Sequence, residues 1–251
     1  MHNMPLRTDG LERAMNVGRV FVLLPLFAAA AFVRATPPQA EVVQATWQVA
    51  LDAKGDVTDV IARSSEMPKL YSKLEPVLRT WKFKPGQIDG QATETRTFLH
   101  LVLRLETKGN EVDVRVLGAA TGGSYGHVTR PAFPDLPAWG RKEGGVMLRV
   151  HYDESGKVTS AEPYEADQRP DPFVQAAKSS VMSWTFSPET VGGHAIASDV
   201  LVPICYQLSP YREPASCKHR NPATGEAMTG SESLALNPAA TLQTDVIGKI
   251  L

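Results

Sequence analysis

The stretch VMLRVHYDESGKV at residues 146–158 decides the fold class of this chain. Apolar and polar residues alternate along its first half, which is the period of two expected of a half-buried β-strand. Asp153 and Gly156 then supply turn residues, so the chain can reverse into a second strand. Apolar residues return at helical spacing over 172–184, and a further alternating segment, 197–208, predicts a closing strand. The order of elements is therefore strand, turn, strand, helix, strand.

Similar turn and tryptophan motifs occur earlier in the chain. DAKGDV at 52–57 resembles DESGKV at 153–158, and WKFKP at 81–85 resembles WTFSP at 184–188. The two turn motifs are 101 residues apart and the two tryptophan motifs 103. Such a period indicates a duplicated domain, because solenoid repeats are roughly 20 to 50 residues long. We predict an α+β fold with two β-β-α-β repeats, each a small three-stranded antiparallel sheet packed on one helix. The first copy is expected to continue into an added hairpin strand over 111–118.

The repeats suggest an organisation for the whole chain. We predict a signal peptide at 1–35, a first copy at 41–118, a second copy at 127–209 and an irregular tail at 210–251. The residues between the copies are small and rich in glycine, which indicates a flexible linker. Weak helical spacing predicts a short helix at the end of the tail, over 242–251.

The N-terminus carries the features of an export signal. Arg19 precedes 14 apolar residues, 20–33, and a potential cleavage site follows at 33–35. We predict cleavage after Ala35. A spanning helix needs about 20 apolar residues, so an uncleaved inner-membrane anchor is the alternative, and only there do we expect membrane contact.

Composition and cysteine count exclude several functions. The 26 lysines and arginines are balanced by 27 aspartates and glutamates, so we expect no nucleic acid partner. The two cysteines, Cys205 and Cys217, form neither a CxxC pair nor a Cys/His cluster, which argues against a zinc module or a thiol redox centre. His151 and Asp153 lie on one strand face but lack a third ligand nearby. We therefore predict no metal and no cofactor.

A serine hydrolase motif is present in outline. The GGSYG stretch at 122–126 fits G-x-S-x-G around Ser124, and Asp153 and His194 follow in the order of a catalytic triad. A nucleophile elbow must be followed at once by a helix, which the two prolines in 127–134 prevent. We predict that the protein is not an enzyme, with a hydrolase centred on Ser124 as an alternative.

Six features of the second copy occur in a recognisable order. They are PAFP at 131–134, EGGV at 143–146, the Asp/Gly hairpin at 153–158, WTFSP at 184–188, Gly193 and the closing strand at 199–208. This pattern resembles the C-terminal domain of TonB, the periplasmic part of a transducer that carries inner-membrane energy to outer-membrane transporters. The resemblance covers about residues 128–209, and a degenerate copy without the opening PAFP motif covers about 41–106.

The resemblance implies a non-catalytic periplasmic binding or scaffold protein. Its closing strand would accept an extended segment of an envelope protein, such as an outer-membrane receptor, by sheet addition. The edge of a small sheet also carries unpaired backbone groups that can template another strand. The predicted partner-binding residues lie on the closing strand and beside the opening motif: Asp199, Val200, Leu201, Val202, Arg130 and Phe133. A membrane-anchored energy transducer is the alternative function, and pairing of this strand with the other copy is the alternative fate of the edge.

The cysteines support one further prediction. Cys205 and Cys217 are separated by 11 residues in a chain predicted to reach an oxidising compartment. We predict a disulfide that attaches the tail to the closing strand, and two free thiols are the alternative.

Overall fold

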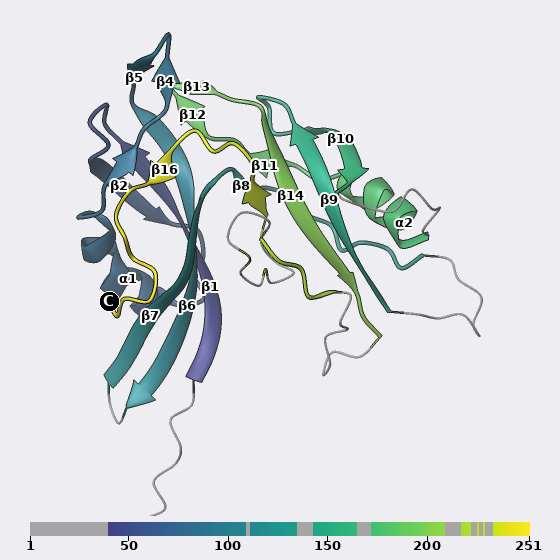
Figure 1. Cartoon of the computed structure of the whole chain (residues 1–251), viewed down its shortest axis with the longest axis horizontal. Helices are drawn as coiled ribbons and strands as arrows, with labels where there is room; N and C mark the ends of the chain where they lie inside the picture. The colour runs from purple at the N-terminus through teal and green to yellow at the C-terminus, as the bar shows by residue number, and fades with distance from the viewer. Residues whose placement is uncertain are drawn as a thin grey trace, which may run out of the picture. The chain divides into compact units, whose positions relative to one another are not determined.

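The computed structural model (Figure 1) describes residues 40–108, 111–134, 143–164, 172–208, 217–221, 225, 228 and 233–251. All of its elements fall within one unit, Pro38–Leu251, whereas the predicted signal peptide lies outside the described residues. None of the described helices is long and apolar enough to cross a membrane.

The first half of the described chain forms strands around one helix. Strand β1 (Ala40–Leu51) lies between β2 (Val57–Ala62) and β6 (Thr95–Lys108), antiparallel to both, and helix α1 (Pro68–Leu78) packs on one face of the sheet (Figure 1). A further strand, β7 (Glu111–Gly122), extends the sheet beyond β6. The apolar residues that alternate along these strands meet the helix in a core that includes Trp47, Leu74 and Leu101. Short two-residue strands complete this half: β3 (Phe83–Lys84), β4 (Gln87–Ile88), β5 (Gln91–Ala92) and β8 (Ser124–Tyr125).

The second half forms a smaller antiparallel sheet in the order β10-β9-β14-β15. Its strands are β9 (Gly144–Tyr152), β10 (Val158–Pro163), β14 (Ser198–Tyr206) and β15 (Leu234–Ala235). Helix α2 (Pro172–Val181) covers one face and packs its buried Phe173, Ala177 and Val181 on a second core. The α+β class is confirmed, and the added hairpin strand expected at 111–118 is present as β7, which continues to Gly122. The second sheet does not stop at the three strands that we predicted, because β15 joins it.

In each repeat, the Asp-x-x-Gly turn contacts the Trp-x-Phe-x-Pro segment of the same repeat. Gly55 has a φ of 80°, and a Cβ there would lie 1.8 Å from the carbonyl oxygen of Phe83. Gly156 has a φ of 82°, and a Cβ there would lie 2.0 Å from the carbonyl oxygen of Phe186. Only glycine tolerates both this conformation and this approach. Each Asp-x-x-Gly turn therefore requires its own Trp-x-Phe-x-Pro segment as a neighbour.

Carboxylates hold both turns in the same way. Asp52 Oδ1 accepts hydrogen bonds from the amides of Lys54 and Asp56, and Asp153 Oδ1 accepts them from those of Ser155 and Lys157. Ordered turns of this kind are typical of aspartate at the first turn position.

The predicted flexible linker at 119–126 is wrong. Residues as far as Gly122 continue β7, and β8 pairs with β11 (Phe186–Ser187). The glycines serve close packing, since a Cβ on Gly123 would lie 2.1 Å from the hydroxyl of Tyr152. Strand β12 (Thr190–Val191), which pairs with β13 (His194–Ala195), also pairs with the start of β6.

The predicted helix over 242–251 is also wrong. Residues 233–251 contain no helix, and β16 (Thr241–Leu242) pairs with β3. The amide of Leu251 donates to the carbonyl of Val114, so the end of the chain runs beside β7. Ala240 and Val246 are buried in the first core. These apolar residues are buried against the first sheet, so the segment does not form the helix that its weak spacing predicted.

Candidate functional site

The predicted binding edge lies on β14, between two other strands. On one side, β14 pairs with β9 along its full length. On the other side, Val200 pairs with Ala235 and Leu201 with Leu234, and the amide of Leu236 donates to the carbonyl of Asp199 at 2.9 Å. The expectation of a free edge at 199–202 is therefore wrong, because the tail of the same chain occupies it. Pairing with the other copy, the alternative, is not found on this strand either.

Both faces of β14 are covered as well. Val200 and Val202 belong to the core beneath α2, while Leu201, which points to the opposite face, is completely buried. The backbone edge that β15 occupies is therefore the side of this strand that another strand could pair with.

The predicted disulfide is confirmed. Cys205 on β14 is bonded to Cys217, with a Cα–Cα distance of 5.2 Å, and Cys217 is fully buried. The bond fixes the tail near one end of β14, and β15 meets the same strand near the other end. The tail is thus attached to this strand at two points.

The opening motif lies elsewhere on the second sheet. The ring of Phe133 packs against those of Tyr206 and Phe173, with centroid distances of 5.4 and 6.3 Å. Tyr206 ends β14, four residues beyond Val202, and Arg130 is exposed. The prediction that Arg130 and Phe133 contact a partner beside 199–202 therefore finds no support in the described contacts.

Hydrogen bonds to α2 and to the segment after it explain the position of residues 129–132. The indole nitrogen of Trp184 donates to Thr129 Oγ1 at 3.2 Å, and the amide of Ala132 donates to Ser180 Oγ at 3.3 Å. The segment before the second sheet therefore follows the end of α2.

Charged side chains surround the start of β14. The carboxylate of Asp199 lies 3.2 Å from a guanidinium nitrogen of Arg149 and 3.3 Å from His151 Nδ1. His151 thus faces Asp199, whereas Asp153 holds the turn. The described residues contain no group of three potential metal ligands.

A buried carboxylate that sequence reasoning missed joins three segments. Glu189 is fully buried; it accepts hydrogen bonds from Thr97 Oγ1 at 2.6 Å and from the amide of Ala239 at 2.8 Å. Burial raises the pKa of this carboxyl above its usual value, although both hydrogen bonds act against the shift. Its partners are 92 and 50 residues away in sequence, so no local pattern could have identified it.

The structure around Ser124 does not fit the hydrolase alternative. Ser124 lies in β8, where it pairs with Ser187, and 126–134 contains no helix to complete a nucleophile elbow. No described contact brings Asp153 or His194 to its hydroxyl.

Comparison with known proteins agrees with the sequence resemblance. Residues 129–208 match the family model for the Gram-negative bacterial TonB protein C-terminal. No curated protein and no solved structure matched the chain. The match covers the segment before β9, strands β9, β10 and β14 and helix α2. This part of the chain, residues 129–208, is a TonB C-terminal-like domain.

Proposed function

We propose that the protein is a non-enzymatic binding or scaffold protein of the Gram-negative envelope that recognises an extended segment of a partner at the edge of β14. The observation that carries the proposal is that this edge accepts a strand, since β15 pairs there at Val200 and Leu201. Its pairing is only two residues long, so a longer segment would form more backbone hydrogen bonds. The partner would take the place of β15.

Envelope localisation rests on separate observations. Residues 129–208 match a family of Gram-negative bacteria, and the Cys205–Cys217 disulfide fits an oxidising compartment such as the periplasm. An outer-membrane receptor is the first candidate partner. The signal peptide at 1–35 and its cleavage after Ala35 belong to this proposal.

Duplication is the second part of the proposal. The two Asp-x-x-Gly turns share glycine conformation, carboxylate hydrogen bonds and a neighbouring Trp-x-Phe segment. The element order β1, β2, α1, β6 also matches β9, β10, α2, β14. We assign 41–118 to a degenerate copy whose edge on β6 is already filled by β7.

The test compares two glycine variants, one of which weakens the pairing of β15, and neither substitution lies in β14. A Cβ on Gly122 would lie 2.4 Å from the Cβ of Ala235, so Gly122→Ala should displace β15. Gly193→Ala is the matched control, since Gly193 also has a positive φ but no atom lies within 4 Å of its Cβ. Hydrogen exchange at Ala235 and Leu236 would verify the displacement.

A photo-crosslinker at Asp199 would then identify what occupies the edge in an envelope extract. We expect Gly122→Ala to crosslink more of one partner than the parent or Gly193→Ala does, through one extended segment of that partner. Equal crosslinking by all three proteins, with β15 released only in Gly122→Ala, would refute edge recognition.

A further inference from the structure

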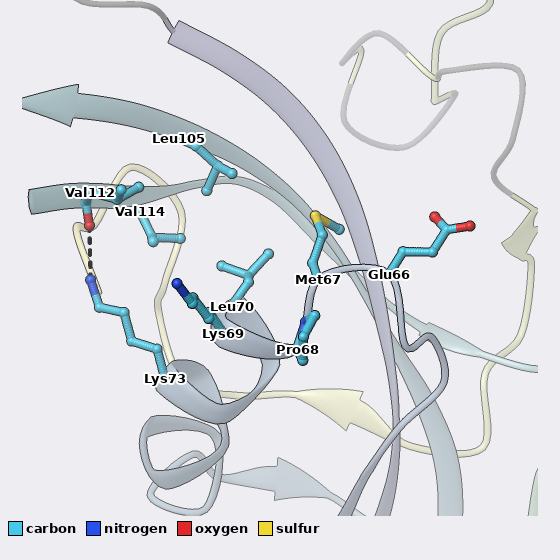
Figure 2. Close-up of a pocket in the computed structure, with 9 residues that line it drawn as sticks. All are labelled: Glu66, Met67, Pro68, Lys69, Leu70, Lys73, Leu105, Val112 and Val114. Carbon is cyan, nitrogen blue, oxygen red and sulfur yellow. Dashed lines mark hydrogen bonds between the residues drawn. The ribbon is translucent and has the colours of Figure 1, made fainter.

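An apolar groove opens in the first repeat, at the start of α1. It has a volume of about 540 Å³ and is lined by nine residues: Glu66, Met67, Pro68, Lys69, Leu70, Lys73, Leu105, Val112 and Val114. Figure 2 shows them arranged between the first turns of the helix and strands β6 and β7. This volume is in the range of roughly 300 to 1,000 Å³ typical of small-molecule sites.

The groove exists because the helix is shorter than the sheet that it covers. Helix α1 has 11 residues and is about 16 Å long, whereas β6 has 14 residues and extends about 46 Å. The inward-facing residues at the far end of the β6–β7 hairpin therefore have no helix above them. Val112 is 41% exposed, although the next inward-facing residue, Val114, is buried.

The second repeat shows what fills the equivalent place. There, Phe133 packs against Phe173 of α2 and Tyr206 of β14. The spacing of 103 residues between the tryptophan motifs aligns Phe173 with Leu70 and Tyr206 with Leu103. The first copy lacks the opening motif, so an apolar group is missing beside Leu70, and the groove lies there.

The rim of the groove is positively charged. Figure 2 shows the side chains of Lys69 and Lys73 reaching from α1 to the β7 side of the groove, while the carboxylate of Glu66 points away from them. Lys73 Nζ donates one hydrogen bond to the carbonyl of Val112 at 2.9 Å, which leaves two of its three donors. Lys69 has no ion pair or side-chain hydrogen bond within the part of the chain that the structure describes.

Neighbouring carboxylates do not cancel this charge. Glu106 and Asp113 alternate with Leu105 and Val114 along paired strands, so they belong to the opposite face of the sheet. The start of α1 has no side-chain cap and no acidic residue in its first turn, so its helix dipole adds to the positive potential.

We propose that this groove binds a single-chain fatty carboxylate. The acyl chain would lie against Met67, Leu105 and Val114, and the carboxylate would accept hydrogen bonds from the ammonium groups of Lys69 and Lys73. A flexible methionine and branched aliphatic side chains suit a chain without fixed shape. The site lies apart from the β14 edge, so the proposal does not depend on the proposed function.

Binding would be measured by calorimetry on the complete, disulfide-bonded protein, with dodecanoate below its micelle concentration as the probe. Dodecanol and dodecyltrimethylammonium carry the same chain with a neutral or cationic head, and acetate carries the head alone. We expect dodecanoate to bind at least tenfold more tightly than either long-chain analogue, and acetate not to bind. Equal binding of the three long-chain probes would overturn the proposal.

Variants locate the site. The double variant Lys69→Gln/Lys73→Gln should weaken dodecanoate binding at least tenfold, and Val112→Trp should abolish it by filling the groove. Lys54→Gln, an exposed lysine of the first turn, is the matched control and should bind like the parent. Each variant is compared with the parent by circular dichroism and thermal unfolding.

If both folded variants bind dodecanoate like the parent, the proposal is wrong. It is equally wrong if no dodecanoate binds while Val112→Trp converts a dimer to a monomer, because a second copy of the chain then fills the groove.

Discussion

Lowering the pH from 7 to 5 should destabilise the protein by about 2 kcal/mol through one partly buried side chain, His100. The imidazole Nε2 donates to the carbonyl of Gly123 at 3.2 Å, so the unprotonated Nδ1 faces Thr46 Oγ1 at 3.1 Å and accepts its hydroxyl hydrogen. Burial lowers the pKa of His100 from 6.5 to about 4, although the bond to Gly123 opposes the shift. The folded protein therefore holds this histidine neutral.

The direction of the pH effect depends on whether the folded or the unfolded chain takes up the proton at the higher pH. Between pH 6.5 and about 4 the unfolded chain takes up a proton at His100 and the folded chain does not, so the free energy of unfolding falls as the pH falls. The complete loss, reached below pH 4, is about 3 kcal/mol, since one pKa unit is equivalent to about 1.36 kcal/mol. Most of the loss between pH 7 and 5 lies below pH 6.5.

Urea unfolding at pH 7 and pH 5, followed by tryptophan fluorescence, measures this effect. In His100→Gln the loss between the two pH values should be about 2 kcal/mol smaller than in the parent, whatever the absolute stability of the variant. His127→Gln, at an exposed position, should keep the parent's pH dependence. Glu189, whose pKa is raised, acts in the opposite direction but equally in all three proteins. An unchanged pH dependence in a folded His100→Gln would refute the reasoning.

Three further changes test the contacts that hold the fold. Cys205→Ser/Cys217→Ser opens a link across 12 residues and should reduce the free energy of unfolding by about 3 kcal/mol in urea; an unchanged midpoint would mean that the tail is held by packing alone. Gly156→Ala should lower thermal stability much more than Gly193→Ala, because both have a positive φ but only the first places a Cβ 2.0 Å from a carbonyl oxygen; equal losses would contradict the contact with Phe186. Glu189→Ala should cost about 2 to 4 kcal/mol at pH 7, since it leaves the buried Thr97 hydroxyl and the partly buried Ala239 amide without this acceptor, whereas Glu189→Gln keeps one acceptor oxygen and should cost less. If the two Glu189 variants are equally stable, these hydrogen bonds contribute nothing measurable.

Strong local patterns allowed the main strands and both helices to be predicted. Alternation over 146–152 corresponds to β9, and the helical spacing over 172–184 corresponds to α2, which ends three residues earlier at Val181. The overrun has a simple cause, because Trp184 stays in the core after the helix ends, and its amide donates to the carbonyl of Val181. Trp184 is apolar because it is buried in the core, so the apolar spacing runs past the last residue of the helix.

The elements that sequence analysis missed depend on distant contacts. Strand β15 has only two residues, too few for a period of two to be recognised, and it exists because β14 offers an edge more than 30 residues earlier in the chain. The disulfide could be predicted because there are only two cysteines. The charged environment of Asp199 could not, since Arg149 and His151 reach it across a strand pair whose register is set by folding.

The covered edges suggest why the tail is part of the fold. An exposed strand edge can pair with any other chain, which risks aggregation. Here one segment, 233–251, pairs with β14 at its start and hydrogen-bonds to the outer side of β7 at its end, so it closes an edge in each half of the molecule. Its two contacts differ in kind. Val116 exchanges hydrogen bonds with the backbone of Gly248 and Lys249, and Val246 is buried. Strand β15 contributes two residue pairs, and its Ala235 lies against Gly122. The β14 edge therefore has the shorter cover of the two, and it is the one where an incoming strand would displace the fewest contacts.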